Sequence, residues 1–173
     1  MENDFSRYEL FEHNLKEKYP AMFSQPYGGI CVGEGWWPIL EALCGQIQAY
    51  IEWKNRTRKH YLENPNPLKE EIPEEVPQVV VAQIKEKFGG LRFYYEGGDD
   101  YVRGLVTMAE LWAGRTCEEC GVPGVSRQGG WIKTLCDEHH LKREAARKPK
   151  INNQVTVDEL NREHKELQER GRA

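Results

Sequence analysis

The chain has 173 residues and a mass of 20.1 kDa, which suits one packed domain with an accessory module and excludes a large multidomain enzyme. Hydrophobic residues make up 39% and charged residues 30% of the sequence, and aromatic residues compensate for the modest apolar share, so global disorder is excluded. No apolar run approaches the roughly 18 residues of a membrane span, and the N-terminal residues lack the pattern of a secretory signal. We therefore expect a soluble, cytoplasmic protein without a membrane partner.

The net charge of −4 is unevenly distributed. Residues 1–114 carry 12 basic and 18 acidic side chains, whereas residues 115–173 carry 12 basic and 10 acidic ones. A weakly basic C-terminal part is compatible with nucleic acid, but it falls short of the clustered charge that commits a domain to nucleic-acid binding.

Two amphipathic helices are expected in the first 60 residues. Apolar side chains recur at helical spacing from Asp4 to Lys18, and Pro20 disfavours continuation of that helix. A glycine-rich run then leads to Pro38, which suits the first turn of a second, longer helix. The basic stretch 54–60 is interpreted as the solvated end of this helix, where positive charge complements the helix dipole. The predicted apolar face of the second helix consists of Ile39, Leu40, Leu43, Ile47, Tyr50 and Ile51.

A loop rich in proline and glutamate is expected at 64–77, because this composition cannot bury enough apolar surface to order itself. The β-branched run 79–84 and the aromatic run 91–95 then predict a β-hairpin that packs against the helices. Asp99 is expected to cap a third helix. The predicted buried stripe of this helix consists of Val102, Leu105, Val106, Ala109 and Trp112.

The strongest signal is a set of three cysteines and one histidine. Cys117 and Cys120 form a C-x-x-C pair, and after 15 intervening residues Cys136 and His139 form a C-x-x-H pair. This spacing lets each pair hold one side of a tetrahedral ion, and three thiolates with one imidazole suit structural zinc better than any harder metal. We predict one Zn²⁺ ion that folds the chain and does no chemistry, because four protein ligands fill its coordination sphere.

The residues between the two pairs predict a treble-clef or ribbon-like module. Turn residues within 121–135 favour a hairpin, and a helix is expected to open at Cys136. His140 is the alternative fourth ligand, but the two-residue spacing favours His139.

Two further cysteines lie outside this set. Cys44 falls on the apolar side of the second predicted helix and is expected in the core as a reduced thiol. Cys31 lies in the glycine-rich turn, where a nucleophilic role is an alternative that the lack of a nearby histidine disfavours.

No catalytic set stands out in the sequence. The glycine-rich run lacks the Gly-Lys-Ser/Thr ending of a phosphate-binding loop, and the zinc pairs lack the flanking motif of a deaminase. The stretch from Asp137 to His140 has the composition of a small zinc-braced nuclease site, but His139 is already used as a zinc ligand. Only His140 remains, without a second metal-binding histidine or asparagine nearby. We therefore expect a protein that is not an enzyme, and a metal-dependent nuclease is the lesser alternative.

Two sets of residues are candidates for binding. Arg92 and Tyr94 are expected on the exposed face of the hairpin, while Phe93 and Tyr95 turn toward the core. The helix after Cys136 adds a basic set suited to phosphates or to an acidic protein surface. This basic set consists of Lys142, Arg143 and Arg147.

Four segments together resemble a family of small uncharacterised proteins encoded by bacteriophages and prophages. They are residues 18–23, 33–39, 84–94 and the cysteine-rich stretch 117–139. The resemblance implies a phage accessory protein made in the bacterial cytoplasm that binds a host protein or assembly and blocks it, such as a component of a host defence system. A nucleic-acid-binding module that uses the basic helix is the alternative.

The sequence thus predicts an α+β fold in which helices pack on a β-hairpin or small antiparallel sheet, with a treble-clef or ribbon-like zinc module attached. The expected parts are an α+β domain at 1–114, a zinc-binding module at 115–147 and a tail at 148–173. A capping box at Thr156 and Glu159 predicts a short helix in the tail.

Overall fold

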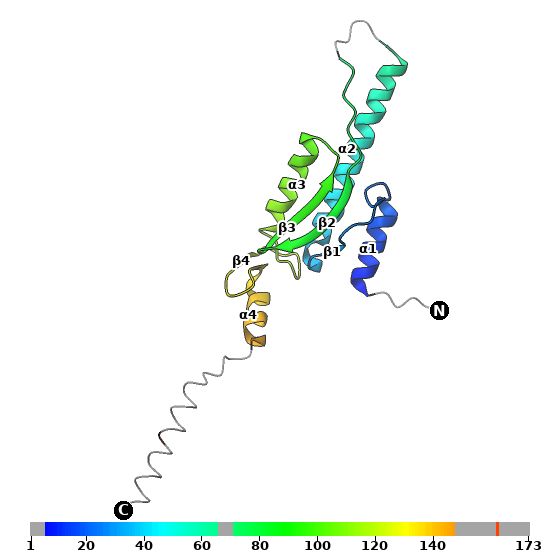
Figure 1. Ribbon diagram of the computed structural model, residues 1–173. Coiled ribbons are helices and arrows are strands. Elements are labelled where there is room, and N and C mark those ends of the chain that lie inside the picture. The colour runs from blue at the N-terminus through cyan, green and yellow to red at the C-terminus, as the bar shows by residue number, and fades with distance from the viewer. Residues whose placement is uncertain (1–5, 66–70, 148–161, 163–173) are drawn as a thin grey trace, which may run out of the picture. The chain divides into compact units, whose positions relative to one another are not determined.

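The computed structural model describes residues 6–65, 71–147 and 162 (Figure 1). The chain divides into a unit of residues 1–140 and a unit of residues 141–173. None of the helices in the described ranges is long and apolar enough to cross a bilayer. The elements in chain order are α1 Arg7–Lys18, β1 Ile30–Cys31, the 3₁₀ helix η1 Glu34–Trp36, α2 Trp37–Glu63, β2 Val80–Lys87, β3 Gly90–Glu96, α3 Asp100–Ala113, β4 Val125–Arg127, β5 Lys133–Leu135 and α4 Asp137–Ala146.

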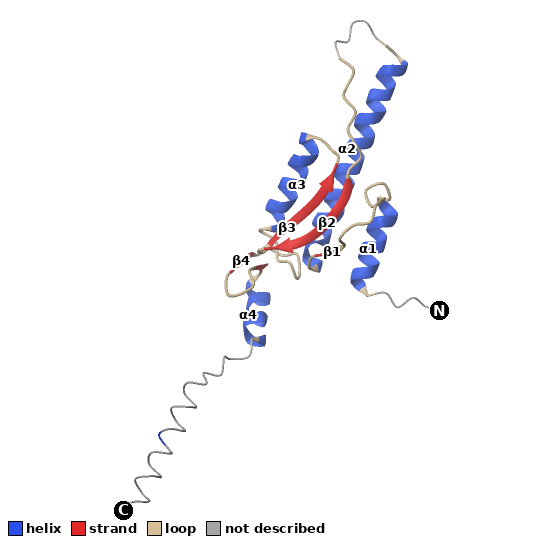
Figure 2. Cartoon of the chain, viewed as in Figure 1, coloured by secondary structure: helices blue, strands red, loops and turns tan. Residues whose placement is uncertain are grey.

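The predicted α+β fold is confirmed, and the structure adds one strand to it (Figure 2). Strands β2 and β3 form the expected antiparallel hairpin. The two-residue strand β1 pairs with β2 in parallel, with Ile30 opposite Ile84, which makes a three-stranded mixed sheet. Such a short strand leaves no periodic signal in the sequence, so its pairing was not predicted.

Local hydrogen bonds set where the first and third helices begin. The Ser6 side chain accepts the backbone N–H of Glu9 while the Glu9 carboxylate accepts the backbone N–H of Ser6, a capping box that starts α1 at Arg7. Asp99 caps α3 as predicted, accepting backbone N–H groups of Tyr101 and Val102, each at 3.1 Å.

The core lies between α2, α3 and the hairpin, since α3 packs against both α2 and β3 (Figure 1). The buried face of α2 matches most of the predicted face, and Cys44 lies in the core as expected. Phe93 is buried and Tyr94 is exposed, also as expected. The largest fully buried side chains are Trp36, Met22, Leu40, Ile47, Ile84 and Leu91.

One predicted core residue is not in the core. Trp112 is 62% exposed, and Ala113 is fully buried in its place. The buried stripe of α3 runs through Val102, Val106, Ala109 and Ala113, and successive residues differ by about 100° around a helix, so Trp112 turns away from this stripe. The prediction for Trp112 was wrong because the buried stripe continues four residues after Ala109, to Ala113, and not three residues after it, to Trp112.

Residues 71–77 of the Pro/Glu-rich loop are held against α2. The Asn55 amide makes two hydrogen bonds of 2.9 Å with the backbone of Val76, whose side chain is buried. The Arg58 guanidinium donates to the Pro73 carbonyl at 2.7 Å. The basic end of α2 therefore fixes this loop as well as facing solvent, and α2 itself continues to Glu63.

Apart from Arg162, the residues of the predicted tail helix lie outside the described part of the chain, and the boundaries expected at 114/115 and 147/148 stay predictions.

Candidate metal centre

The four predicted ligands come from three successive elements of the chain. Cys117 and Cys120 flank a tight turn that follows α3, and the β4–β5 hairpin leads to Cys136 and to the first turn of α4, which carries His139. Gly121 has a φ of 78° and donates its N–H to the Cys117 carbonyl, which closes the turn between the first two ligands. The turn that carries Cys117 and Cys120, residues 117–121, is called the knuckle below. The order of knuckle, hairpin and helix is the one predicted for a treble-clef module.

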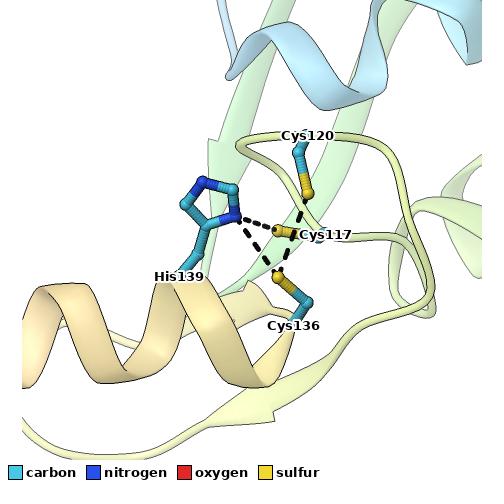
Figure 3. A group of neighbouring side chains, drawn as sticks. All are labelled: Cys117, Cys120, Cys136 and His139. Atoms are coloured by element: carbon cyan, nitrogen blue, oxygen red, sulfur yellow. Dashed lines mark hydrogen bonds between the residues drawn. The ribbon is translucent and has the colours of Figure 1, made fainter.

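The four side chains point toward one another (Figure 3). Their ligand atoms all lie within 4.8 Å of one another. The His139 Nδ1 atom lies 3.6 Å from the Cys117 sulfur and 3.3 Å from the Cys136 sulfur, and the Cys120 and Cys136 sulfurs are 3.9 Å apart. A tetrahedral zinc site has edges of about 3.8 Å between sulfurs and about 3.6 Å between sulfur and nitrogen, given its bond lengths. The residues therefore fit a metal ion of this size and geometry.

The protein around Cys117 favours its thiolate. Burial alone disfavours the charged form, but backbone N–H groups of Cys136, Cys120 and Glu119 hydrogen-bond the sulfur and outweigh burial. The net effect lowers the pKa of Cys117 to about 7. Because metals bind thiolates and not thiols, this arrangement prepares the buried ligand for an ion.

The knuckle is fastened to η1 by backbone contacts. The Gly35 N–H donates to the Glu118 carbonyl at 2.8 Å, and the Trp36 indole N–H donates to the Thr116 carbonyl at 2.8 Å. The Gly33 N–H donates to the Glu118 carboxylate at 3.1 Å. These bonds connect segments about 80 residues apart in the sequence, so the cluster and η1 hold each other in place.

Glu118 is a buried acid at the centre of these contacts. Its side chain is only 4% exposed, and its second oxygen lies 3.3 Å from the Lys133 ammonium of β5. Burial raises the pKa of Glu118, while the Lys133 charge and the Gly33 N–H favour its ionised form. Its backbone N–H also donates to the Thr134 carbonyl of β5. Glu118 therefore connects the knuckle both to η1 and to the second hairpin, β4–β5.

The second hairpin is in turn fixed to the main sheet. The Thr134 hydroxyl is buried and donates to the Gly89 carbonyl at 2.6 Å, and the Trp131 indole N–H donates to Glu86 at 2.9 Å. An ion pair between Arg127 and Asp137 joins β4 to the start of α4. The segments that carry the ligands are thus fixed to η1 and to the β2–β3 hairpin.

The remaining histidine and cysteines are placed elsewhere. His140, the alternative fourth ligand, is outside the group of four. Cys31 is exposed on β1 and Cys44 is buried in α2, where burial raises the pKa of its thiol to about 12.

Thiol reactivity separates these environments in one experiment. We expect one cysteine, Cys31, to react promptly with iodoacetamide in the native metal-loaded protein, and the three ligand cysteines to join it after chelation. Cys44 should react only on unfolding, because the thiolate is the reactive form and burial raises the pKa of the Cys44 thiol. Peptide mass spectrometry identifies the labelled positions. Prompt labelling of Cys120, which is exposed to solvent, in metal-loaded protein would contradict a metal-bound thiolate there.

The residues predicted to bind a partner are divided between the two units of the chain. Arg92 and Tyr94 both lie on β3, where Arg92 pairs with Glu110 at 3.7 Å and Lys85 lies over the Tyr94 ring. Lys142, Arg143 and Arg147 lie on or next to α4 in the second unit, and Arg147 pairs with Glu144 at 2.9 Å.

Sequence reasoning missed the residues that support the metal cluster. Gly33 and Gly35 have no metal-binding side chain, Glu118 is not one of the four clustered ligands, and the two glycines lie about 80 residues from Glu118 in the sequence. The only signal was the pair of glycines two residues apart next to Trp36, and that signal alone does not indicate which segment packs on them.

Comparison of the chain with protein-family models, with curated proteins and with solved structures found no match.

Proposed function

We propose that the chain is a non-enzymatic, zinc-stabilised protein whose activity is to bind another protein. The observation that carries the proposal is an apolar ridge on α3, formed by Met108, Leu111 and Trp112, which are 61%, 63% and 62% exposed. Exposed apolar patches of adjacent large side chains are typical of interaction sites in soluble proteins. Tryptophan and methionine are also enriched at such sites.

Zinc is the metal that the donor set favours. Soft thiolates with one imidazole at tetrahedral spacing suit Zn²⁺, and harder ions prefer oxygen ligands. The chain supplies all four donors from one rigid cluster, so the proposed role of the ion is architectural: it stabilises the knuckle that packs on η1.

The resemblance to phage and prophage proteins supports a bacterial protein or assembly as the partner. On this proposal the chain acts in the cytoplasm of the bacterial host, and a host defence component is a partner of the expected class. The nucleic-acid alternative has less support, because Arg92 and Arg147 already pair with carboxylates of the chain.

A matched pair of leucine substitutions tests the proposal. Leu111 on the α3 ridge and Leu62 near the end of α2 are both exposed leucines in helices, at 63% and 53%. We expect Leu111→Glu to abolish recovery of a stoichiometric protein partner from host lysate, and Leu62→Glu to leave recovery at the wild-type level. The measurement is quantitative mass spectrometry of affinity-purified complexes. Equal recovery with both variants, or no stoichiometric partner with wild-type protein, would refute the proposal.

A further inference from the structure

The α3 ridge borders a groove between two helices. Residues from the start of α2 and from the C-terminal half of α3 line a hollow of about 390 Å³. The ring centroids of Tyr50, in the middle of α2, and Tyr101, at the start of α3, lie 4.3 Å apart. Ile39, at the start of α2, and Trp112, at the end of α3, line the same hollow. The two helices therefore run antiparallel. The lining is almost wholly apolar and consists of Pro38, Ile39, Ala42, Leu43, Gln46, Leu105, Met108, Ala109 and Trp112.

A second hollow of about 740 Å³ continues this one toward the metal centre. The two hollows share Met108 and Trp112, and the second is completed by Leu111, Arg115, Thr116, Gly121 and Pro123. The two hollows adjoin at Met108 and Trp112, and we name them together the α2–α3 groove, although residues of α2 line only the first hollow. From Leu105 to Arg115 its length is about 15 Å, which matches about three turns of a helix.

Among the described residues that line the two hollows, Arg115 is the only charged one. It is exposed, and no described carboxylate lies within ion-pair distance of its guanidinium. The acids of α2 and α3 all have other partners: Glu41 contacts Lys18, Glu52 contacts Gln48, Glu63 contacts Lys59, Asp100 contacts Arg103 and Glu110 contacts Arg92. The groove thus presents an apolar floor with one uncompensated positive charge at its end, on a chain whose net charge is −4.

We propose that the α2–α3 groove binds an acidic amphipathic helix of the partner protein. Apolar side chains of that helix, spaced at i, i+3, i+4 and i+7, fill the groove between α2 and α3, and a carboxylate beside them pairs with Arg115. Two antiparallel helices leave a furrow into which a third helix packs by the usual ridges-into-grooves geometry. This inference rests on the proposed protein-binding function and specifies the chemistry of the partner segment.

Charge favours such a segment over a second copy of the chain. In a symmetric dimer the same groove faces itself, so each copy would bring another arginine and no free carboxylate from α2 or α3. A partner helix with its own acidic residues supplies the missing charge.

Two model peptides test the inference directly. Both are amphipathic 14-residue helices with leucine at the same i, i+3, i+4 and i+7 positions, and the polar positions carry glutamate in one and lysine in the other. Each is titrated into ¹⁵N-labelled, metal-loaded full-length protein and followed by two-dimensional NMR. We expect saturable binding of the glutamate peptide, with shifts concentrated in the residues of the α2–α3 groove. Binding of the lysine peptide should be about threefold to fivefold weaker, the size of one exposed ion pair.

The net negative charge of the protein attracts the lysine peptide, so a preference for the glutamate peptide cannot come from the overall charge. Arg115→Glu should therefore reverse the preference. The control is Arg103→Glu, which alters an arginine of α3 that is 71% exposed and already pairs with Asp100, and it should leave the preference unchanged.

Three results would overturn the inference. They are the absence of saturable binding by the glutamate peptide, an equal preference in wild-type protein and Arg115→Glu, and a dimer in analytical ultracentrifugation that Leu111→Glu dissociates. If either of the first two occurs while Leu111→Glu still abolishes recovery of a lysate partner, the proposed function stands and only the chemistry assigned to the partner is wrong.

Discussion

Replacing Cys120 with serine is expected to remove the bound metal and to lower the free energy of unfolding by about 3 kcal/mol or more. The ligand atoms of Cys117, Cys120, Cys136 and His139 lie within 4.8 Å of one another, and a hydroxyl is a poor ligand for zinc compared with a thiolate. Without the ion, the two remaining thiols of Cys117 and Cys136 and the His139 imidazole are crowded together with no metal to hold them. The knuckle should then loosen from η1, which it contacts through Glu118 and Thr116.

The matched control is Cys31→Ser. Cys31 and Cys120 are both exposed cysteines, but only Cys120 belongs to the cluster. Cys31→Ser should retain one equivalent of metal and change stability by no more than about 0.5 kcal/mol, as most surface substitutions do. Elemental analysis and urea denaturation measure both effects. Equal metal content and equal stability in the two variants would refute a structural role for the cluster.

Gly35→Ala is expected to destabilise the protein by about 3 kcal/mol and to weaken metal binding. A Cβ atom on residue 35 would lie 2.2 Å from the Cys117 carbonyl oxygen and 2.8 Å from the Cys120 backbone nitrogen. Both atoms belong to the backbone that carries two ligands, so neither can give way without moving a sulfur. The effect should appear in thermal unfolding and in the metal affinity measured by competition with a chelator.

Gly104→Ala should act in the opposite direction. Gly104 lies in the exposed part of α3, and nothing lies within 4 Å of the position of its Cβ. Alanine favours a helix over glycine by about 1 kcal/mol, so this variant should be slightly more stable than wild type and bind metal equally. If Gly35→Ala behaves like Gly104→Ala, then the close packing of η1 on the knuckle is not what positions the ligands.

The periodic parts of the fold could be predicted from the sequence because their signals are local. The apolar face of α2, the cap at Asp99 and the β2–β3 hairpin each depend on residues a few positions apart. The spacing of the two ligand pairs was equally local, which is why the four residues that the structure brings together were identified in advance.

The rest depended on contacts between distant segments. Strand β1 exists because Gly28 and Gly29 bring the chain beside β2, where Gly28 donates to the Ala82 carbonyl and Gly29 accepts from Ile84. The packing of Gly35 on the knuckle joins residues about 80 positions apart. Trp112 was predicted as part of the buried helical stripe, yet Ala113 lies against the core, and the exposed Trp112 indole forms part of the α3 ridge.

X-ray absorption spectroscopy at the zinc edge, on protein purified without added chelator, tests the account most directly. We predict one zinc per chain with three sulfur neighbours at about 2.3 Å and one nitrogen neighbour at about 2.0 Å. A first shell that contains a water oxygen in place of one of these ligands, or protein that contains no transition metal, would contradict the claim that a closed zinc site stabilises this fold.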